Sequence, residues 1–144
     1  MYASNERGFD GGKKVKGRKR HTVTDTMGNL LAVKVHAANI HDTVAGEEVF
    51  KAALAKYPSI KRCAADAGYR KTFVNALKAL GVPVDIIEKI APKIWDVLPM
   101  RWIVERTFGW SSYSRRLSKD YEISTVSAEN MFMVSHIATL LRRY

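Results

Sequence analysis

Two acidic residues are candidates for metal-dependent chemistry at a phosphate group. Asp66 follows a short apolar segment, residues 60–65, and precedes a glycine turn, whereas Glu105 lies inside a basic and aromatic stretch, residues 101–122. Two Mg²⁺ ions about 4 Å apart repel each other, so a two-metal site surrounds them with carboxylates. An acid at a strand end and an acid on a packed helix are one way to hold that geometry. We therefore interpret Asp66 and Glu105 as candidate metal ligands and catalytic residues.

Each acid also has an ordinary structural interpretation. Asp66 could cap a helix or a turn, although ligands in α/β sheets bind beyond the carboxyl ends of strands, where Asp66 is expected. Glu105 could form an ion pair with Arg101, four residues earlier. That order, with the base on the N-terminal side, adds little helix stability. The two roles can coexist if Arg101 holds the carboxylate until a metal ion arrives.

Positive charge suggests the partner. The chain has 24 Lys and Arg residues against 14 Asp and Glu residues, a formal net charge of +10, which favours nucleic acid first and an anionic membrane second. Residues 13–20 hold six positive charges and are either a solvated run or, as we prefer, a phosphate-binding segment. The candidate DNA-binding residues are Lys13, Lys14, Lys16, Arg18, Lys19, Arg20, Arg101, Arg106, Arg115, Arg116 and Lys119.

Composition and sequence pattern argue against several other classes of protein. No run of 18 or more apolar residues predicts a transmembrane helix, and the first eight residues lack the apolar centre of a signal peptide. The single cysteine, Cys63, cannot form an internal disulfide and is more typical of a small buried side chain than of a nucleophile. We therefore expect a cytoplasmic protein that does not bind membranes.

Strands and helices alternate in the predicted order. Strand-forming residues on both sides of Gly28-Asn29 predict a hairpin, with Asp25 in its turn. A helix is expected over 43–56, with Asp42 as its N-cap, while His41 lies either in solvent or near a site. The remaining expected elements are a strand at 60–66, a helix at 72–80, an edge strand at 82–87, an irregular insertion at 89–99, a helix from Pro99 and a C-terminal helix at 127–143.

The two ends of the chain carry more specific expectations. The whole chain, residues 1–144, is expected to form a single domain. Three glycines between residues 8 and 12 predict that its residues 1–16 are a flexible basic arm. The C-terminal helix is predicted to bury one apolar face. That face comprises Val126, Met133, Val134, Ile137, Leu140 and Leu141.

Four segments carry a family resemblance. They read Gly-Arg-Lys-Arg-His (17–21), Asp-Ala-Gly-Tyr-Arg (66–70), Arg-Trp-Ile-Val-Glu-Arg-Thr-Phe-Gly-Trp (101–110) and Arg-Arg-Leu-Ser-Lys-Asp-Tyr-Glu (115–122). In order and spacing they resemble the DDE transposases of bacterial insertion sequences over nearly the whole chain. The resemblance implies an α/β fold with an RNase H-like mixed sheet flanked by helices. It also implies cleavage and transfer of double-stranded DNA at transposon ends, with two Mg²⁺ or Mn²⁺ ions.

The resemblance assigns roles to individual residues. Asp66 matches the second acid of the catalytic triad, Glu105 the third, and Arg101 the arginine of the Arg-x-x-x-Glu signature. Part of the family has a basic residue seven positions after the glutamate, where this chain has Ser112. The basic residues that could replace its phosphate contact are Arg115, Arg116 and Lys119.

The main departure concerns the first acid, which in this family lies on a central strand shortly upstream of residues 17–21. The only acids nearby are Glu6 and Asp10, and glycines around Asp10 predict a loop. We therefore expect the C-terminal part of a catalytic domain, without its first acid, its first and central strand or an N-terminal DNA-binding domain. Such a chain would be marginally stable and inactive until an upstream transposase fragment or a second copy completed it. The alternative is an inactive DNA-binding remnant or an inhibitor of transposition. The signature segments give no support to an unrelated RNA-binding protein.

Overall fold

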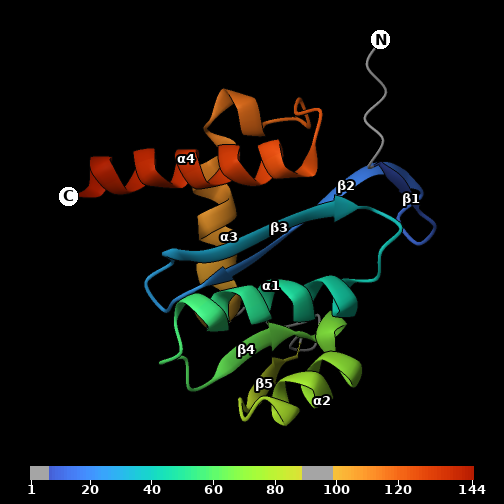
Figure 1. Ribbon diagram of the computed structural model, residues 1–144. Helices are drawn as coiled ribbons and strands as arrows, with labels where there is room; N and C mark the ends of the chain where they lie inside the picture. The colour runs from blue at the N-terminus through green and yellow to red at the C-terminus, as the bar shows by residue number, and fades with distance from the viewer. Residues whose placement is uncertain (1–6, 89–98) are drawn as a thin grey trace, which may run out of the picture.

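Helices flank a small divided β-sheet in this protein, which confirms the α/β class (Figure 1). The computed structural model describes residues 7–88 and 99–144, so most of the insertion expected at 89–99 lies outside the described residues. The elements are β1 Gly8–Asp10, β2 Val15–Thr24, β3 Leu30–Ala37, α1 Asp42–Lys56, β4 Cys63–Asp66, η1 Ala67–Tyr69, α2 Thr72–Ala79, β5 Val84–Ile87, α3 Pro99–Ser112, η2 Arg115–Leu117 and α4 Thr125–Arg143.

The predicted hairpin is confirmed. Strands β2 and β3 pair antiparallel, with His21 opposite Lys34. The carboxylate of Asp25 accepts hydrogen bonds from the amides of Met27 and Asn29 at 2.8 and 2.9 Å, which confirms its expected place in the turn. Gly28 has a φ of +85° in the same turn, a conformation that glycine adopts without a steric penalty.

The segment before the hairpin is more ordered than its glycines suggest. Strand β1 pairs antiparallel with the start of β2, and Asp10 lies opposite Val15. The carboxylate of Asp10 accepts from the amides of Gly12 and Lys13 and closes the intervening turn. Asp10 therefore ends a strand, and the expectation that it lies in a loop is wrong. Flexibility of an arm over residues 1–16 stays a prediction, and residues 1–6 lie outside the described part.

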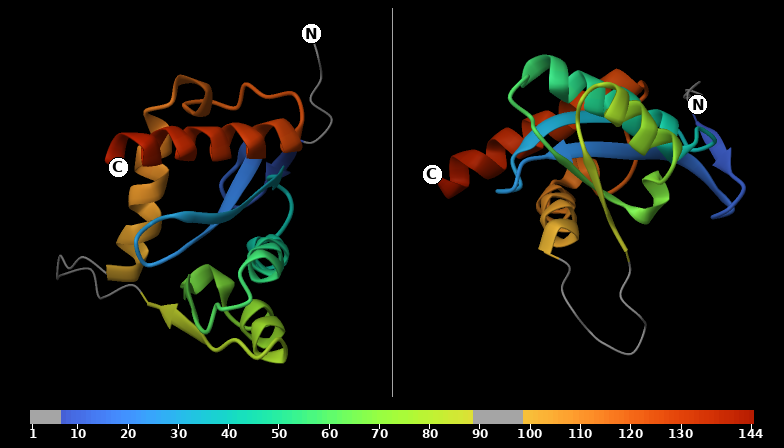
Figure 2. Two further views of the ribbon diagram at one scale, coloured as in Figure 1. Left: turned by 60° about the vertical axis from the view of Figure 1, so that its left-hand side comes forward. Right: turned by 90° about the horizontal axis from the view of Figure 1, so that it is seen from below.

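The sheet is divided into two parts. Strands β1, β2 and β3 form one antiparallel sheet, and β4 and β5 form a separate parallel pair in which Asp66 lies opposite Ile87. Helix α1 lies between the hairpin and α2 (Figure 1; Figure 2, left). Its buried Phe50 packs in one core cluster with Phe73 and Leu77 of α2, and Val23 of β2 packs against that cluster. Apolar packing by α1 thus joins the two parts.

Helix α4 lies along β3 and covers its outer edge. The amide of Leu30 donates to Nε2 of His136 at 3.0 Å, and the amide of Val35 donates to Glu129 Oε1 at 2.9 Å. These side chains occupy backbone donors that a free strand edge would otherwise present to another chain. The sheet edge is therefore closed by a helix and not by another strand.

The prediction that α4 buries its apolar face is wrong. Leu141 is 78% exposed and Val126 is 61% exposed, and Met133, Val134 and Ile137 are also exposed. The residues that α4 buries are Ala128, Phe132, Ser135 and His136. The physical reason is that α4 packs on the polar backbone edge of β3, where hydrogen-bonding side chains are useful. No helix in the described ranges is long and apolar enough to cross a membrane.

Candidate active site

Asp66 lies at the carboxyl end of β4, as the sequence predicts. Its side chain accepts a hydrogen bond from the Gly68 amide at 2.9 Å and caps the short helix η1. The residue is exposed. The capping interpretation is therefore correct, but one carboxylate oxygen engaged by one amide leaves further lone pairs for another ligand.

Glu105 lies on α3 and is exposed. It forms the expected ion pair, in which Arg101 Nε donates to Glu105 Oε1 at 2.8 Å. Both side chains are substantially exposed to solvent, so the pair contributes little to stability. An exposed pair of this kind can open at low cost when a more strongly charged ligand competes for the carboxylate.

Asp66 and Glu105 line the same cavity. Its volume is about 540 Å³, and it is bounded by β2, β4, α1 and α3. Asp25 also lines the cavity, but its carboxylate oxygens bond Met27 and Asn29 in the hairpin turn. Most of the remaining wall is apolar. It includes Val23, Val49, Phe50, Ala65, Phe73, Ile103 and Phe108.

The cavity also separates two strand edges. Residues 18–24 of β2 pair with β3 along one edge, and β4 pairs with β5 along one edge. In the described ranges no strand pairs with the opposite edge of β4 or of this part of β2. Helix α3 contacts both β2 and β4 across the division. The two candidate acids thus lie beside the place where the sheet is interrupted.

A partly buried hydrogen bond joins the two sides of this site. His21 of β2 and Tyr69 of η1 meet at 2.7 Å between Nδ1 and the phenol oxygen. Burial, and to a smaller extent the charge of the stacked His36 ring, lower the pKa of His21 to about 4, against the smaller opposing effect of Asp42. Neither residue is among the sequence-predicted site residues, although His21 lies in the family segment 17–21 and Tyr69 in the segment 66–70, and that position is the sequence signal for them.

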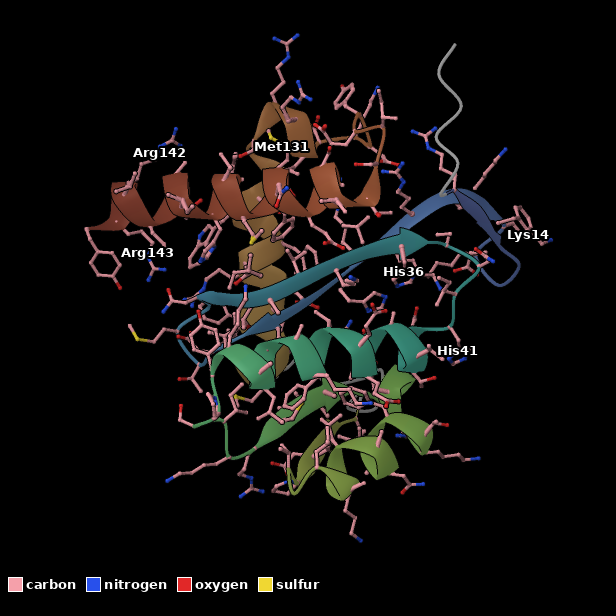
Figure 3. The ribbon with its side chains drawn as sticks, viewed as in Figure 1. Lys14, His36, His41, Met131, Arg142 and Arg143 are labelled. Atoms are coloured by element: carbon pink, nitrogen blue, oxygen red, sulfur yellow. The ribbon has the colours of Figure 1, made fainter. Side chains whose placement is uncertain are left out.

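The structure corrects the expected start of α1. His41, not Asp42, is the N-cap, because its Nδ1 accepts from the Thr43 amide at 3.3 Å (Figure 3). Asp42 is the first helical residue, and its carboxylate accepts from Lys19 Nζ at 2.9 Å. A histidine side chain can supply the same kind of acceptor as an aspartate, so the composition alone could not decide between adjacent residues.

The basic segment 13–20 divides into two groups. The Arg18 side chain is only 2% exposed, and its guanidinium donates to the carbonyls of Glu122 and Ile123. Arg20 donates to the Leu117 carbonyl. Lys19 lies between the carboxylates of Asp10 and Asp42. The exposed members are Lys13, Lys14 and Lys16. DNA contact by all six stays a prediction, although three of them already have protein partners.

The basic residues around Glu105 are similarly divided. The Arg106 guanidinium lies 4.4 Å from the Trp102 ring centroid and 4.7 Å from that of Trp110, and it donates to the Met27 carbonyl. Arg116 pairs with Glu122. Arg115 and Lys119 are exposed, and no described carboxylate pairs with either side chain. Arg106 therefore helps attach α3 to the hairpin turn.

Comparison with known families identifies the chain. The family model described as transposase DDE domain matches residues 2–141. No significant match to a curated protein or to a solved structure accompanies it. An α/β fold with two acids that line one cavity beside an interrupted sheet is consistent with the RNase H-like class of domains. The chain belongs to the transposase DDE-domain family, so its function class is transposition and DNA is the partner of its class.

Enzymes with this domain generally use divalent metal ions. The carboxylate oxygens of Asp66 and Glu105 are the donor type that Mg²⁺ and Mn²⁺ prefer. Among the described residues, however, no group of three or more His, Cys, Asp or Glu side chains is placed to hold a metal ion. The residues fit the expected metal in chemical type, and Asp66 and Glu105 would supply two of its ligands.

Proposed function

We propose that this domain cleaves and transfers DNA strands at transposon ends in a Mg²⁺- or Mn²⁺-dependent reaction. Asp66 and Glu105 would hold two metal ions, because two neighbouring cations repel each other and need anionic ligands around them. The observation that carries the proposal is that both acids line one cavity in a chain of the transposase DDE-domain family. The single cysteine, Cys63, supports a cytoplasmic setting.

When bound, the metal ions would activate the attacking oxygen and stabilise the leaving oxygen of the phosphodiester. The chain itself positions the ligands. Capping of η1 orients Asp66, and the hydrogen bond between Tyr69 and His21 ties η1 to β2. Arg101 holds Glu105 in place and, once released from the carboxylate, presents a guanidinium that can contact a phosphate oxygen.

We further propose that a third carboxylate comes from an extended segment that is not among the described residues. It would lie between β2 and β4, where two strand edges border the cavity. The wall of the cavity is apolar both toward α1, at Phe50, and toward α3, at Phe108. A strand buried on both faces is typically apolar throughout. An upstream transposase fragment or a second copy could supply such a strand.

The decisive experiment replaces Glu105 in a protein that also contains the upstream segment. Glu105→Gln removes the negative charge with little change in shape, so strand cleavage should fall at least a hundredfold while DNA binding in the absence of metal changes less than threefold. Cleavage of a labelled transposon-end duplex and gel-shift binding measure the two effects.

Glu47 provides a matched control. It also forms an exposed helical ion pair, with Lys51 four residues later. Glu47→Gln should leave both cleavage and binding unchanged. If Glu105→Gln retained cleavage at the level of the control variant, Glu105 would not be a metal ligand.

A DNA-binding remnant or inhibitor is the second candidate function. It is favoured by the same finding that limits the first: the described residues include no three-ligand metal group but have several exposed basic side chains. An inhibitor should bind transposon ends and suppress cleavage by an intact transposase of the same element. Titration of the 144-residue chain into that cleavage reaction distinguishes the two candidates.

A further inference from the structure

A second hollow lies at the other end of α3 from the candidate acids. This groove has a volume of about 380 Å³ and runs between the end of α3, η2 and α4. Figure 1 shows α3 crossing behind the hairpin, from the level of α1 to the level of α4. The groove residues that carry the argument below are Tyr113, Ser114, Arg115, Ser135, Thr139 and Arg142.

Two arginines at the groove carry positive charge that the described part of the protein does not neutralise. Arg115 and Arg142 are exposed, and no described carboxylate or carbonyl accepts from either guanidinium. By contrast, Arg116 beside them is paired with Glu122. In Figure 3, Arg142 and Met131 lie on the same upper side of α4, whereas Arg143 lies on its lower side. Arg142 therefore lies on the groove side of the helix, and so does Met131, which also lines the groove.

An exposed aromatic ring and several hydroxyl groups complete the groove. Tyr113 is 90% exposed, an unusual environment for a ring that gains energy from burial. Ser114 and Ser135 meet across the groove at 2.5 Å between their Oγ atoms, and Thr139 Oγ1 donates to the Ser135 carbonyl. These hydroxyl groups make the wall polar but are bonded within the protein, so the groove offers a ligand mainly its two exposed guanidinium groups and a free aromatic face.

We propose that this groove is a DNA-binding site distinct from the cavity that contains Asp66 and Glu105. Arg115 and Arg142 bind phosphate groups of one strand, and Tyr113 stacks on an unpaired base at its end. Guanidinium groups form paired hydrogen bonds with phosphate oxygens, and bases stack on aromatic rings with little regard to sequence. The inference rests on the proposed function in taking DNA as the ligand. It does not depend on the metal site, because binding in the groove needs no metal.

The position of the groove along α3 suits a strand that also reaches the acids. Glu105 and Ser112, the residue before Tyr113, are seven residues apart and lie on nearly the same face of α3, which corresponds to roughly 10 Å along its axis. Successive nucleotides of one strand rise by about 3.4 Å. A DNA strand with its reacting phosphate at Glu105 would therefore reach the groove within a few further nucleotides. The groove would then hold the end of that strand.

The test measures binding of the full 144-residue chain to a labelled duplex with a short single-stranded overhang, in EDTA, by fluorescence anisotropy. The double variant Arg115→Gln/Arg142→Gln should weaken binding more than tenfold at low salt. It should also reduce the slope of log K against log salt by about 1.4 to 1.8, the change for two lost phosphate contacts.

A control variant removes the same charge elsewhere. Lys56→Gln/Lys78→Gln changes the ends of α1 and α2, outside the groove, and should change affinity less than threefold. Thermal unfolding checks that both variants fold, and Arg115→Lys/Arg142→Lys should restore most of the binding. An equal loss in the two Gln variants would show a general charge effect and would overturn the proposal.

Tyr113 gives an independent readout. Tyr113→Ala should weaken binding to the overhang duplex roughly five- to a hundredfold and leave a blunt duplex nearly unaffected, whereas Tyr113→Phe keeps the ring and should bind normally. Unchanged overhang binding by Tyr113→Ala would contradict the stacking role. Because binding is measured without metal, the two proposals can fail separately. If the protein did not cleave DNA, the groove could still bind it. If the groove did not bind DNA, the proposed roles of Asp66 and Glu105 would be unaffected.

Discussion

His21 Nδ1 lies 2.7 Å from the phenol oxygen of Tyr69, and this hydrogen bond joins the antiparallel sheet to the segment that follows Asp66. Burial raises the pKa of the Tyr69 phenol above its ordinary value, so the phenol stays protonated and can donate. His21 then accepts at Nδ1 and carries its proton on Nε2, which is 3.9 Å from Asp42 Oδ1. Since β2 and β4 are not paired with each other, this polar link helps define the position of one of the candidate metal ligands.

Tyr69→Phe tests that link. The substitution keeps the ring, which packs against Phe73, but leaves the buried His21 Nδ1 without its partner. We expect a loss of about 1–2 kcal/mol in the free energy of unfolding, the usual cost of an unsatisfied buried polar atom. Urea denaturation at pH 7 measures it. Tyr113→Phe, at a fully solvated ring, is the control and should change stability by less than about 0.5 kcal/mol. Equal stability of the two variants would show that the hydrogen bond contributes nothing.

The buried His21 also predicts the pH dependence of stability. Its pKa is about 4 in the folded chain, because of burial, against an ordinary value of 6.5. Between these values the unfolded chain binds more protons, so folding loses stability as the pH falls. The expected loss from pH 7 to pH 5 is about 2 kcal/mol for this residue. Burial also lowers the pKa of His136, which acts in the same direction.

Substitution isolates the contribution of His21. His21→Gln should flatten the change in unfolding free energy between pH 7 and pH 5, measured by urea denaturation at each pH. His41→Gln, at an exposed helix cap, should leave the slope unchanged. If the slope of the His21→Gln variant equalled that of the parent chain, the histidine would not be the group that titrates.

Local patterns were sufficient for much of this fold. The turn signals around Asp25 and Gly28 predicted the hairpin, because the residues that close it are neighbours in sequence. The apolar segment that ends at Asp66 predicted its place at a strand end. Spacing also predicted the ion pair between Arg101 and Glu105. Each of these features depends on contacts within a few residues.

Features that depend on distant partners were not predictable in the same way. Arg18 belongs to a continuous basic run, but its guanidinium is buried against carbonyls of Glu122 and Ile123, about a hundred residues later. In α4, the helical period correctly indicated a helix, but not which of its sides would pack. His136 faces inward because the edge of β3 presents a backbone amide to it. No pattern within either segment shows where these acceptors and donors lie.

The interrupted sheet leads to the last prediction. If an extended segment completes the site between β2 and β4, a chain that includes the residues encoded directly upstream should be more stable than the 144-residue chain by several kcal/mol. A central strand makes two new hydrogen-bonded ladders and fills an apolar cavity of about 540 Å³. Backbone amides of β2 and β4 should then exchange with deuterium at least tenfold more slowly, as they become part of the most stable structure. Amides of α4, which already packs on β3, serve as the internal reference.

A Gly- and Ser-rich extension of the same length controls for added chain, and should protect neither strand. Equal protection of β2 and β4 by the two extensions would show that the upstream residues do not enter the sheet.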